Sequence, residues 1–220
     1  MLFLPATLTG VNNYPAPKIN LYFPPGFVKV LTEVFKMYEG KNPTALQSQR
    51  WLTESLLSLM KEKPYSKISV IDICKRADLS RQTFYNFFSD KEEILRYYLQ
   101  SRYRSELSKY IGKESLSMNE IVASFIRVLT ENEEVLSYML SNGLDLLIAE
   151  EIARCVNLFA KYFVSEKRND DMLTYSEALL SGALGSFLVR WLKGKDKPSL
   201  DKVTALFYDF FKGELFELEI

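Results

Sequence analysis

The feature of this sequence that most constrains its fold is a three- to four-residue spacing of apolar side chains that begins at Thr44 and continues almost to the C-terminus. The first such stripe runs from Leu46 to Met60 and stops at Lys63-Pro64, because proline cannot continue a helix. The same spacing predicts further helices at residues 69–78, 80–87, 89–107, 118–131, 133–141, 144–165, 171–193 and 199–216. No segment shows the alternation typical of a strand. The sequence therefore predicts an all-α protein of about nine helices.

The first 40 residues lack this regular pattern. Five of the eight prolines lie within them, and only residues 27–38 show a short helical spacing. We expect residues 1–40 to form an irregular N-terminal extension and the compact protein to begin near Met37.

Histidine is absent, and Cys74 and Cys155 are the only cysteines. The chain therefore lacks Ser-His and Cys-His nucleophile pairs, and two distant cysteines do not suggest a disulfide framework or a zinc site. No Gly-rich phosphate loop or nucleophile elbow is present. The sequence predicts a protein that is not an enzyme and binds no cofactor or metal. With no basic leader and no apolar run approaching about 20 residues, we expect a cytoplasmic location and no membrane contact.

Two short helices in succession are predicted between residues 69 and 87. Ser69 with Asp72 forms a capping box for the first, and Ser80 is a good N-cap for the second. Ser89 with Glu92 then caps the next helix. Two short helices joined by a tight turn are the layout of a helix-turn-helix, in which the second helix enters the major groove of DNA.

The segment around residues 80–88 combines an apolar face with a polar one. Three phenylalanines, Phe84, Phe87 and Phe88, are spaced to pack against the preceding helices as core, so they are not expected to stack on bases. The polar residues fall off that face. Arg81, Gln82 and Asn86 carry the forked donors and acceptors that suit guanine and adenine edges, and Thr83 and Tyr85 carry hydroxyls suited to phosphate oxygens.

The charge distribution supports a polyanionic partner for this part of the chain. Residues 41–104 contain twelve Lys or Arg and seven Asp or Glu, a net charge of +5, whereas the whole chain has a net charge of zero. A basic third joined to an acidic remainder is what a protein shows when one part meets nucleic acid.

The stretch "ISVIDICKRADLSRQTFYNFFSDKEEIL", residues 68–95, resembles the DNA-binding signature of the TetR family of bacterial regulators. The resemblance implies that residues 80–87 form the recognition helix and that Lys91 contacts a phosphate. The residues that it implies contact DNA are Ser69, Ser80, Arg81, Gln82, Thr83, Tyr85, Asn86 and Lys91. This chain departs from the family pattern at Asp78, where glycine is usual in the turn, and at Gln82, where a small residue is common.

The last two predicted helices suggest a dimer interface. "YSEALLSGALGSFLVRWLKG" combines small residues with a bulky stripe, and "SLDKVTALFYDFF" repeats apolar residues at helical spacing. The string G-x-x-x-x-x-x-x-R-W-L-x-G is also similar to a C-terminal domain type of TetR-family members from Firmicutes-like bacteria. The expected interface residues are Gly182, Gly185, Ser186, Val189, Val203, Phe207 and Phe210. The alternative is that these two helices form an internal core.

Together these observations predict three parts: an irregular extension at 1–40, a helix-turn-helix domain at 41–92, and a helical ligand-sensing and dimerisation domain at 93–220. The expected function is a DNA-binding transcriptional regulator. We interpret it as a repressor that binds a near-palindromic operator in double-stranded DNA as a homodimer and is released by an effector, with a small hydrophobic molecule as the candidate. The alternative is an adaptor or co-activator that acts through a protein partner.

Overall fold

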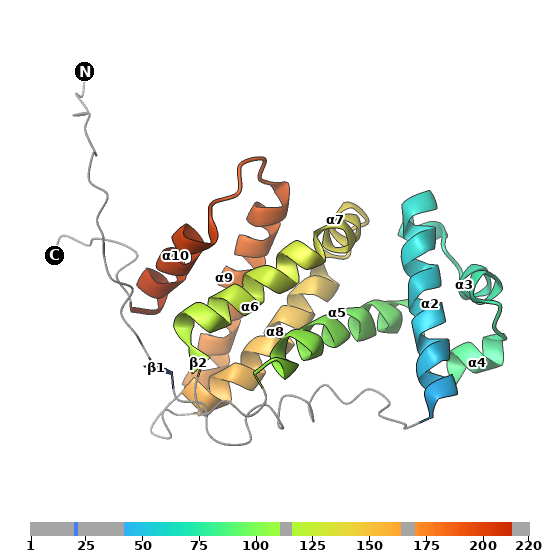
Figure 1. Cartoon of the computed structure of the whole chain (residues 1–220), viewed down its shortest axis with the longest axis horizontal. Coiled ribbons are helices and arrows are strands. Elements are labelled where there is room, and N and C mark those ends of the chain that lie inside the picture. Colours follow the sequence, from blue (N-terminus) through green and yellow to red (C-terminus); the bar gives the residue numbers. More distant parts are fainter. Residues whose placement is uncertain (1–19, 22–41, 111–115, 164–169, 213–220) are drawn as a thin grey trace.

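The computed structural model describes residues 20–21, 42–110, 116–163 and 170–212 (Figure 1). The helix expected at residues 27–38, and all of the N-terminal extension except Asn20 and Leu21, lie outside these residues. Within them the chain is helical apart from one pair of two-residue strands, so the prediction of an all-α fold with a helix-turn-helix is confirmed. Among the described residues, none of the helices combines the length and the apolar composition of a transmembrane span.

The N-terminal part, here called the head, consists of α2 (Pro43–Glu62), a 3₁₀ turn (Tyr65–Lys67), α3 (Val70–Ala77) and α4 (Arg81–Tyr85). Asn42 caps α2 by accepting a hydrogen bond from the Thr44 amide, and proline occupies the first turn, where its missing N–H is not needed. The chain then enters α5 (Lys91–Ser108), which leads from the head into the remaining helices (Figure 1). This helix runs through the domain boundary predicted at residues 92 and 93, so the head continues into the rest of the chain without a flexible linker.

The remaining helices form the body: α6 (Met118–Glu131), α7 (Glu133–Ser141), α8 (Asp145–Phe163), α9 (Asp170–Lys193) and α10 (Leu200–Lys212). Helix α8 packs along α9, and α10 packs against α6. The two short strands, β1 (Asn20–Leu21) and β2 (Leu116–Ser117), pair antiparallel beside α6. The sequence did not indicate them, because two residues are too few to show an alternating pattern.

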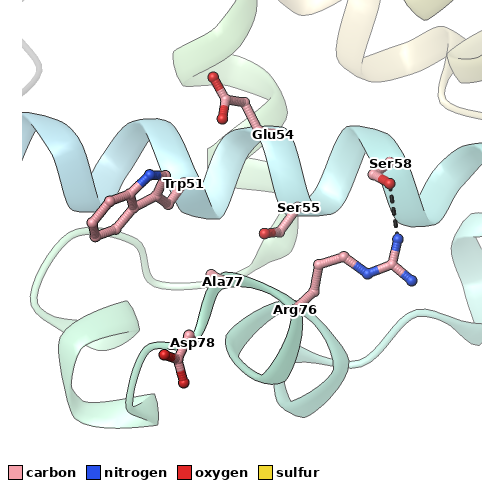
Figure 2. A pocket seen from close by; sticks show the side chains of 7 residues that line it. All are labelled: Trp51, Glu54, Ser55, Ser58, Arg76, Ala77 and Asp78. Atoms are coloured by element: carbon pink, nitrogen blue, oxygen red, sulfur yellow. Dashed lines mark hydrogen bonds between the residues drawn. The ribbon is translucent and has the colours of Figure 1, made fainter.

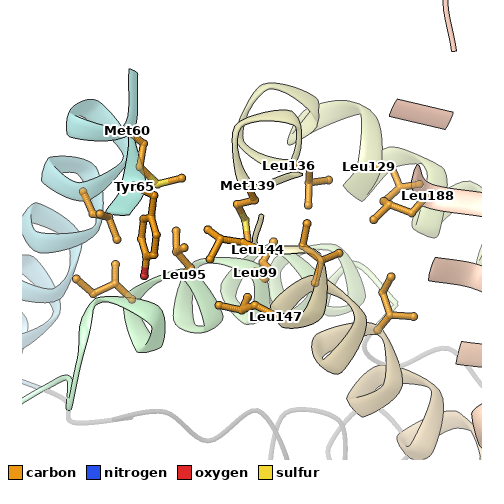
Figure 3. Packing of buried hydrophobic residues seen from close by; sticks show 14 of the residues in the cluster. Met60, Tyr65, Leu95, Leu99, Leu129, Leu136, Met139, Leu144, Leu147 and Leu188 are labelled. Atoms are coloured by element: carbon orange, nitrogen blue, oxygen red, sulfur yellow. The ribbon is translucent and has the colours of Figure 1, made fainter. Parts of the chain in front are cut away.

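Apolar packing is continuous from the head into the body (Figure 3). Met60 and Tyr65 from the head meet Leu95 of α5, and the cluster extends to Met139 of α7 and Leu144.

Two polar contacts reinforce this junction. The Tyr65 amide donates to Asn142 Oδ1 at 2.7 Å, and Lys61 Nζ lies 2.7 Å from Glu134 Oε1. The orientation of the head is therefore set by its contact with α7 as well as by α5.

A buried polar contact joins α5 to α8. Glu151 is only 1% exposed, and its carboxylate accepts hydrogen bonds from Arg96 at 3.2 Å and from Gln100 at 3.0 Å. Arg96 also contacts Glu150 at 2.5 Å. Because a buried carboxylate is costly without such partners, this network specifies how α8 lies against α5.

Candidate nucleic-acid interface

The two short helices of the head begin at capped residues, as their sequence indicates. The Ser69 hydroxyl accepts from the Asp72 amide at 3.2 Å, and Asp72 Oδ2 accepts in return from the Ser69 amide at 2.8 Å, which completes a capping box. The backbone hydrogen bond from Ser69, followed by Lys63 at 3.0 Å, lowers the pKa of Asp72. At α4, Ser80 Oγ accepts from the Thr83 amide at 3.0 Å.

The turn between these helices passes through Asp78. Its backbone has φ 53° and ψ 43°, the left-handed region, and it is the one non-glycine residue with positive φ among those described. The amides of Asp78 and Leu79 both donate to the carbonyl of Cys74, which satisfies the end of α3. Aspartate occupies this region more readily than most residues but with more strain than glycine.

Two phenylalanines anchor α4 and the turn after it to the hydrophobic core of the head. Phe84 and Phe88 are almost fully buried, and their ring centroids lie 6.0 Å apart. The prediction that these rings belong to the core is confirmed. The regular helix ends at Tyr85, shorter than the predicted 80–87, and the amides of Phe87 and Phe88 then donate to the Phe84 carbonyl in a closing turn.

The polar side chains of α4 remain on the surface. Arg81, Gln82, Tyr85 and Asn86 are exposed and Thr83 is half-buried. The Arg81 guanidinium lies 5.9 Å from the centre of the Tyr85 ring. The structure thus brings five of the residues expected to contact DNA together on α4 and its C-cap. Their contacts with DNA remain predictions.

Three other predicted DNA contacts already have partners within the chain. The hydroxyls of Ser69 and Ser80 cap α3 and α4, and both side chains are exposed. Lys91 Nζ donates to the carbonyls of Tyr65 and Ile68, both at 2.8 Å, and lies 4.1 Å from the centre of the Tyr65 ring. Burial lowers the pKa of Lys91. Lys91 therefore joins α5 to the segment before α3, whatever it contacts in DNA.

Tyr65 is the residue of the head that sequence reasoning missed. Its side chain is buried at the junction of head and body, and burial raises the pKa of its phenol. The sequence signal for a buried Tyr65 was an aromatic residue directly after Pro64. The segment between the first two predicted helices shows no apolar periodicity, so this residue was not recognised as core.

The predicted interface residues of α9 and α10 fall into two groups. Val203 and Phe207 are 1% and 8% exposed within a single chain, where Phe207 packs on Phe125 and Phe187, so these two belong to the core of the body. The others retain exposed surface: Gly182, Gly185, Ser186, Val189 and Phe210 are exposed or half-buried.

Two large exposed residues were not in the prediction. Tyr175 and Leu179 of α9 are 67% and 76% exposed, and they are spaced to share a face with Gly182 and Ser186.

A capped helix-turn-helix with an anchored second helix, joined by a continuous helix to an all-α body, is the arrangement of helix-turn-helix proteins that bind DNA. Residues 52–98 match the family described as bacterial regulatory proteins, tetR family. The helix-turn-helix region of this chain is therefore similar to the DNA-binding region of that family.

One curated relative is the HTH-type dhaKLM operon transcriptional activator DhaS of Lactococcus lactis subsp. lactis (strain IL1403). It is 33% identical over 89 residues, which are 39% of this chain and 45% of the relative, so the match spans less than half of the relative's length.

Two solved structures share the fold over most of the chain. A TetR transcriptional regulator from Streptococcus agalactiae 2603V has a TM-score of 0.53 at 17% identity and covers 79% of this chain and 96% of its own. A dihydroxyacetone kinase operon activator DhaS has a TM-score of 0.50 at 18% identity, and the match covers 76% of this chain and 96% of the DhaS chain. At these identities the likeness concerns the fold alone.

Proposed function

We propose that this chain binds double-stranded DNA by placing α4 in the major groove. The observation that carries the proposal is the pairing of a buried anchor, Phe84 and Phe88, with exposed Arg81, Gln82 and Asn86 on α4 and the turn that follows it. Rigid anchoring with donors and acceptors directed outward is what base reading requires. The net charge of +5 over residues 41–104 favours the same partner.

We propose further that the chain acts as a homodimer through α9 and α10, so that two heads read a near-palindromic site. Support comes from the α9 face formed by Tyr175, Leu179, Gly182 and Ser186, which is uncovered in the single chain. A methyl group built on Gly182 or Gly185 would meet nothing within 4 Å, so neither glycine is needed for packing inside this chain.

A charge placed on that face tests the dimer. Leu179→Glu is expected to shift the protein from dimer to monomer in analytical ultracentrifugation, because a buried unpaired carboxylate opposes association. Leu146→Glu is the matched control, since Leu146 is also largely exposed but lies on α8. A wild type that sediments as a monomer at all concentrations contradicts the proposal.

Selection of bound duplexes from a random oligonucleotide pool tests DNA reading. The wild type is expected to enrich a short near-palindrome, and Gln82→Ala is expected to change the preferred base at one position of each half-site. Arg81→Ala should weaken binding to the recovered site, a lost base contact costing about 1–3 kcal/mol. Arg102→Ala, on the exposed side of α5, is the control that should bind normally. Failure to enrich any sequence contradicts the proposal.

The direction of regulation has two candidates. The first candidate is repression, because a protein bound to an operator blocks transcription directly. An effector would then regulate the protein by releasing it from the operator. Activation, as an adaptor or co-activator with a protein partner, is the second candidate, and its direction is favoured because the curated relative is named as a transcriptional activator. A reporter placed behind the recovered site distinguishes them: deletion of this protein raises expression if it represses and lowers expression if it activates.

A further inference from the structure

A surface groove of about 500 Å³ lies on the head, between α2 and the C-terminal end of α3 (Figure 2). We call it the Trp51 groove, and it is lined by Trp51, Glu54, Ser55, Ser58, Arg76, Ala77 and Asp78. Figure 2 shows Trp51 at one end and Arg76, hydrogen-bonded to Ser58 at 2.8 Å, at the other, with Glu54 and Asp78 on opposite edges.

The indole of Trp51 is 45% exposed in a helix whose other face carries the core of the head. The second tryptophan, Trp191, is by contrast buried. Tryptophan is enriched among the residues that form protein–protein interfaces. Tryptophan is also the aromatic residue whose face attracts cations most strongly.

The charges around this ring are not balanced. The Arg76 guanidinium is held by both oxygens of Glu62, at 2.5 and 2.6 Å, so its charge is compensated. Glu54 and Asp78 are exposed, and neither has a recorded ion pair or side-chain hydrogen bond among the described residues. The Trp51 groove therefore holds two uncompensated carboxylates within a part of the chain that is basic overall.

We propose that the Trp51 groove binds a basic, extended segment of a protein partner. One arginine or lysine of that segment lies over the Trp51 ring, and cationic side chains reach Glu54 and Asp78 on the two edges. The carboxylates would repel a DNA phosphate, and the charge of Arg76 is already paired with Glu62, so the charge pattern favours a cationic peptide over nucleic acid. This inference does not depend on the proposed operator binding.

The backbone at Asp78 is consistent with this role. Glycine would adopt the left-handed conformation with less strain, whereas aspartate keeps a carboxylate at the edge of the groove.

A peptide titration of the full-length chain tests the proposal. The probe is the pentapeptide acetyl-Gly-Arg-Ser-Arg-Gly-amide, and the readout is the pair of ¹⁵N-labelled indole N–H signals of Trp51 and Trp191, assigned with Trp51→Phe. We expect the Trp51 signal to move with saturation and the buried Trp191 signal to stay in place. The uncharged peptide with glutamine in place of arginine should leave both signals unchanged.

Removal of the two carboxylates supplies the decisive comparison. An exposed ion pair changes an affinity by about 1.5- to 5-fold, so Glu54→Gln combined with Asp78→Asn is expected to weaken binding about fivefold. Glu131→Gln removes an exposed charge from the body and should bind as the wild type does. Asparagine tolerates the left-handed conformation, and Glu54→Gln alone provides a second variant that leaves the turn untouched.

Three results would overturn the inference. One is equal binding of the arginine and glutamine peptides. Another is an equal loss of affinity in Glu54→Gln and Glu131→Gln, which would indicate only a general charge effect. The third is a shift of the Trp51 signal by duplex DNA that the arginine peptide does not reproduce, which would make the groove a nucleic-acid contact.

Discussion

Replacement of Lys91 by methionine is expected to destabilise the protein, because this lysine holds the start of α5 against the segment before α3. Lys91→Met removes two hydrogen bonds of 2.8 Å to the carbonyls of Tyr65 and Ile68 and an ammonium group 4.1 Å from the centre of the Tyr65 ring. Methionine keeps most of the apolar part of the lysine side chain, so the substitution removes only the positive charge and the hydrogen-bond donors of the ammonium group.

The expected magnitude follows from those contacts. A hydrogen bond to a charged group contributes about 1.5–3 kcal/mol and a cation–π contact about 0.5–1 kcal/mol. Lys91 is half-buried, so water can reach the two carbonyls in the variant and methionine still contacts the ring. We therefore expect a loss of about 2 kcal/mol in the free energy of unfolding, well below the sum of the separate contributions.

Urea denaturation followed by far-UV circular dichroism, at one fixed protein concentration, measures this loss as a lower midpoint with an unchanged slope. Lys67→Met is the matched control, since Lys67 is exposed in the 3₁₀ turn and has no recorded ion pair or side-chain hydrogen bond among the described residues. The reasoning is refuted if Lys91→Met and Lys67→Met unfold at the same urea concentration. Unchanged stability with weaker DNA binding would instead make Lys91 a phosphate contact alone.

Three further predictions concern stability and use the same denaturation assay. At the left-handed turn, Asp78→Gly should raise the free energy of unfolding by about 0.5 kcal/mol and Asp78→Ala should lower it, and the reverse order would contradict the strain argument. Asp72→Asn should lower stability at pH 7, and the difference from the wild type should shrink as the pH falls below about 4. A carboxyl whose folded pKa is depressed stabilises the fold only while it is ionised, so a pH-independent difference would contradict the prediction. Glu151→Ala should cost about 3 kcal/mol because Arg96 then loses its buried partner, whereas Glu134→Ala, in an exposed pair with Lys61, should cost less than about 0.5 kcal/mol. Equal losses would contradict that burial argument.

Much of the local structure could be predicted from the sequence because its causes are local. The capping residues Ser69 and Ser80 start α3 and α4 as expected, and Pro64 follows the end of α2. The exposed and buried sides of α4 also follow from the spacing of its residues. The end of α4 was predicted two residues late, since Phe87 continues the apolar pattern although the backbone has already left the regular helix.

Which part of the chain packs against a given helix face depends on contacts between residues far apart in the sequence. Helical spacing carries no information about these contacts. Val203 and Phe207 were expected at a dimer interface, but the packing of α10 on α6 places them in the core of one chain. Glu151 is an acid that spacing alone would leave in solvent, and only the contact of α8 with α5 buries it.

Caps, proline and apolar periodicity were enough to predict an all-α chain with a capped helix-turn-helix and an apolar face on each helix, because they act over a few neighbouring residues. Which surface covers each apolar face became visible only in the packed fold. In the folded chain Lys91 hydrogen-bonds to Tyr65, 26 residues earlier in the sequence, and Tyr65 hydrogen-bonds to Asn142, 77 residues later. Trp51 lies exposed in the same groove as Glu54 and Asp78. Periodicity identifies an apolar face, whereas the surface that covers it depends on how distant helices pack together.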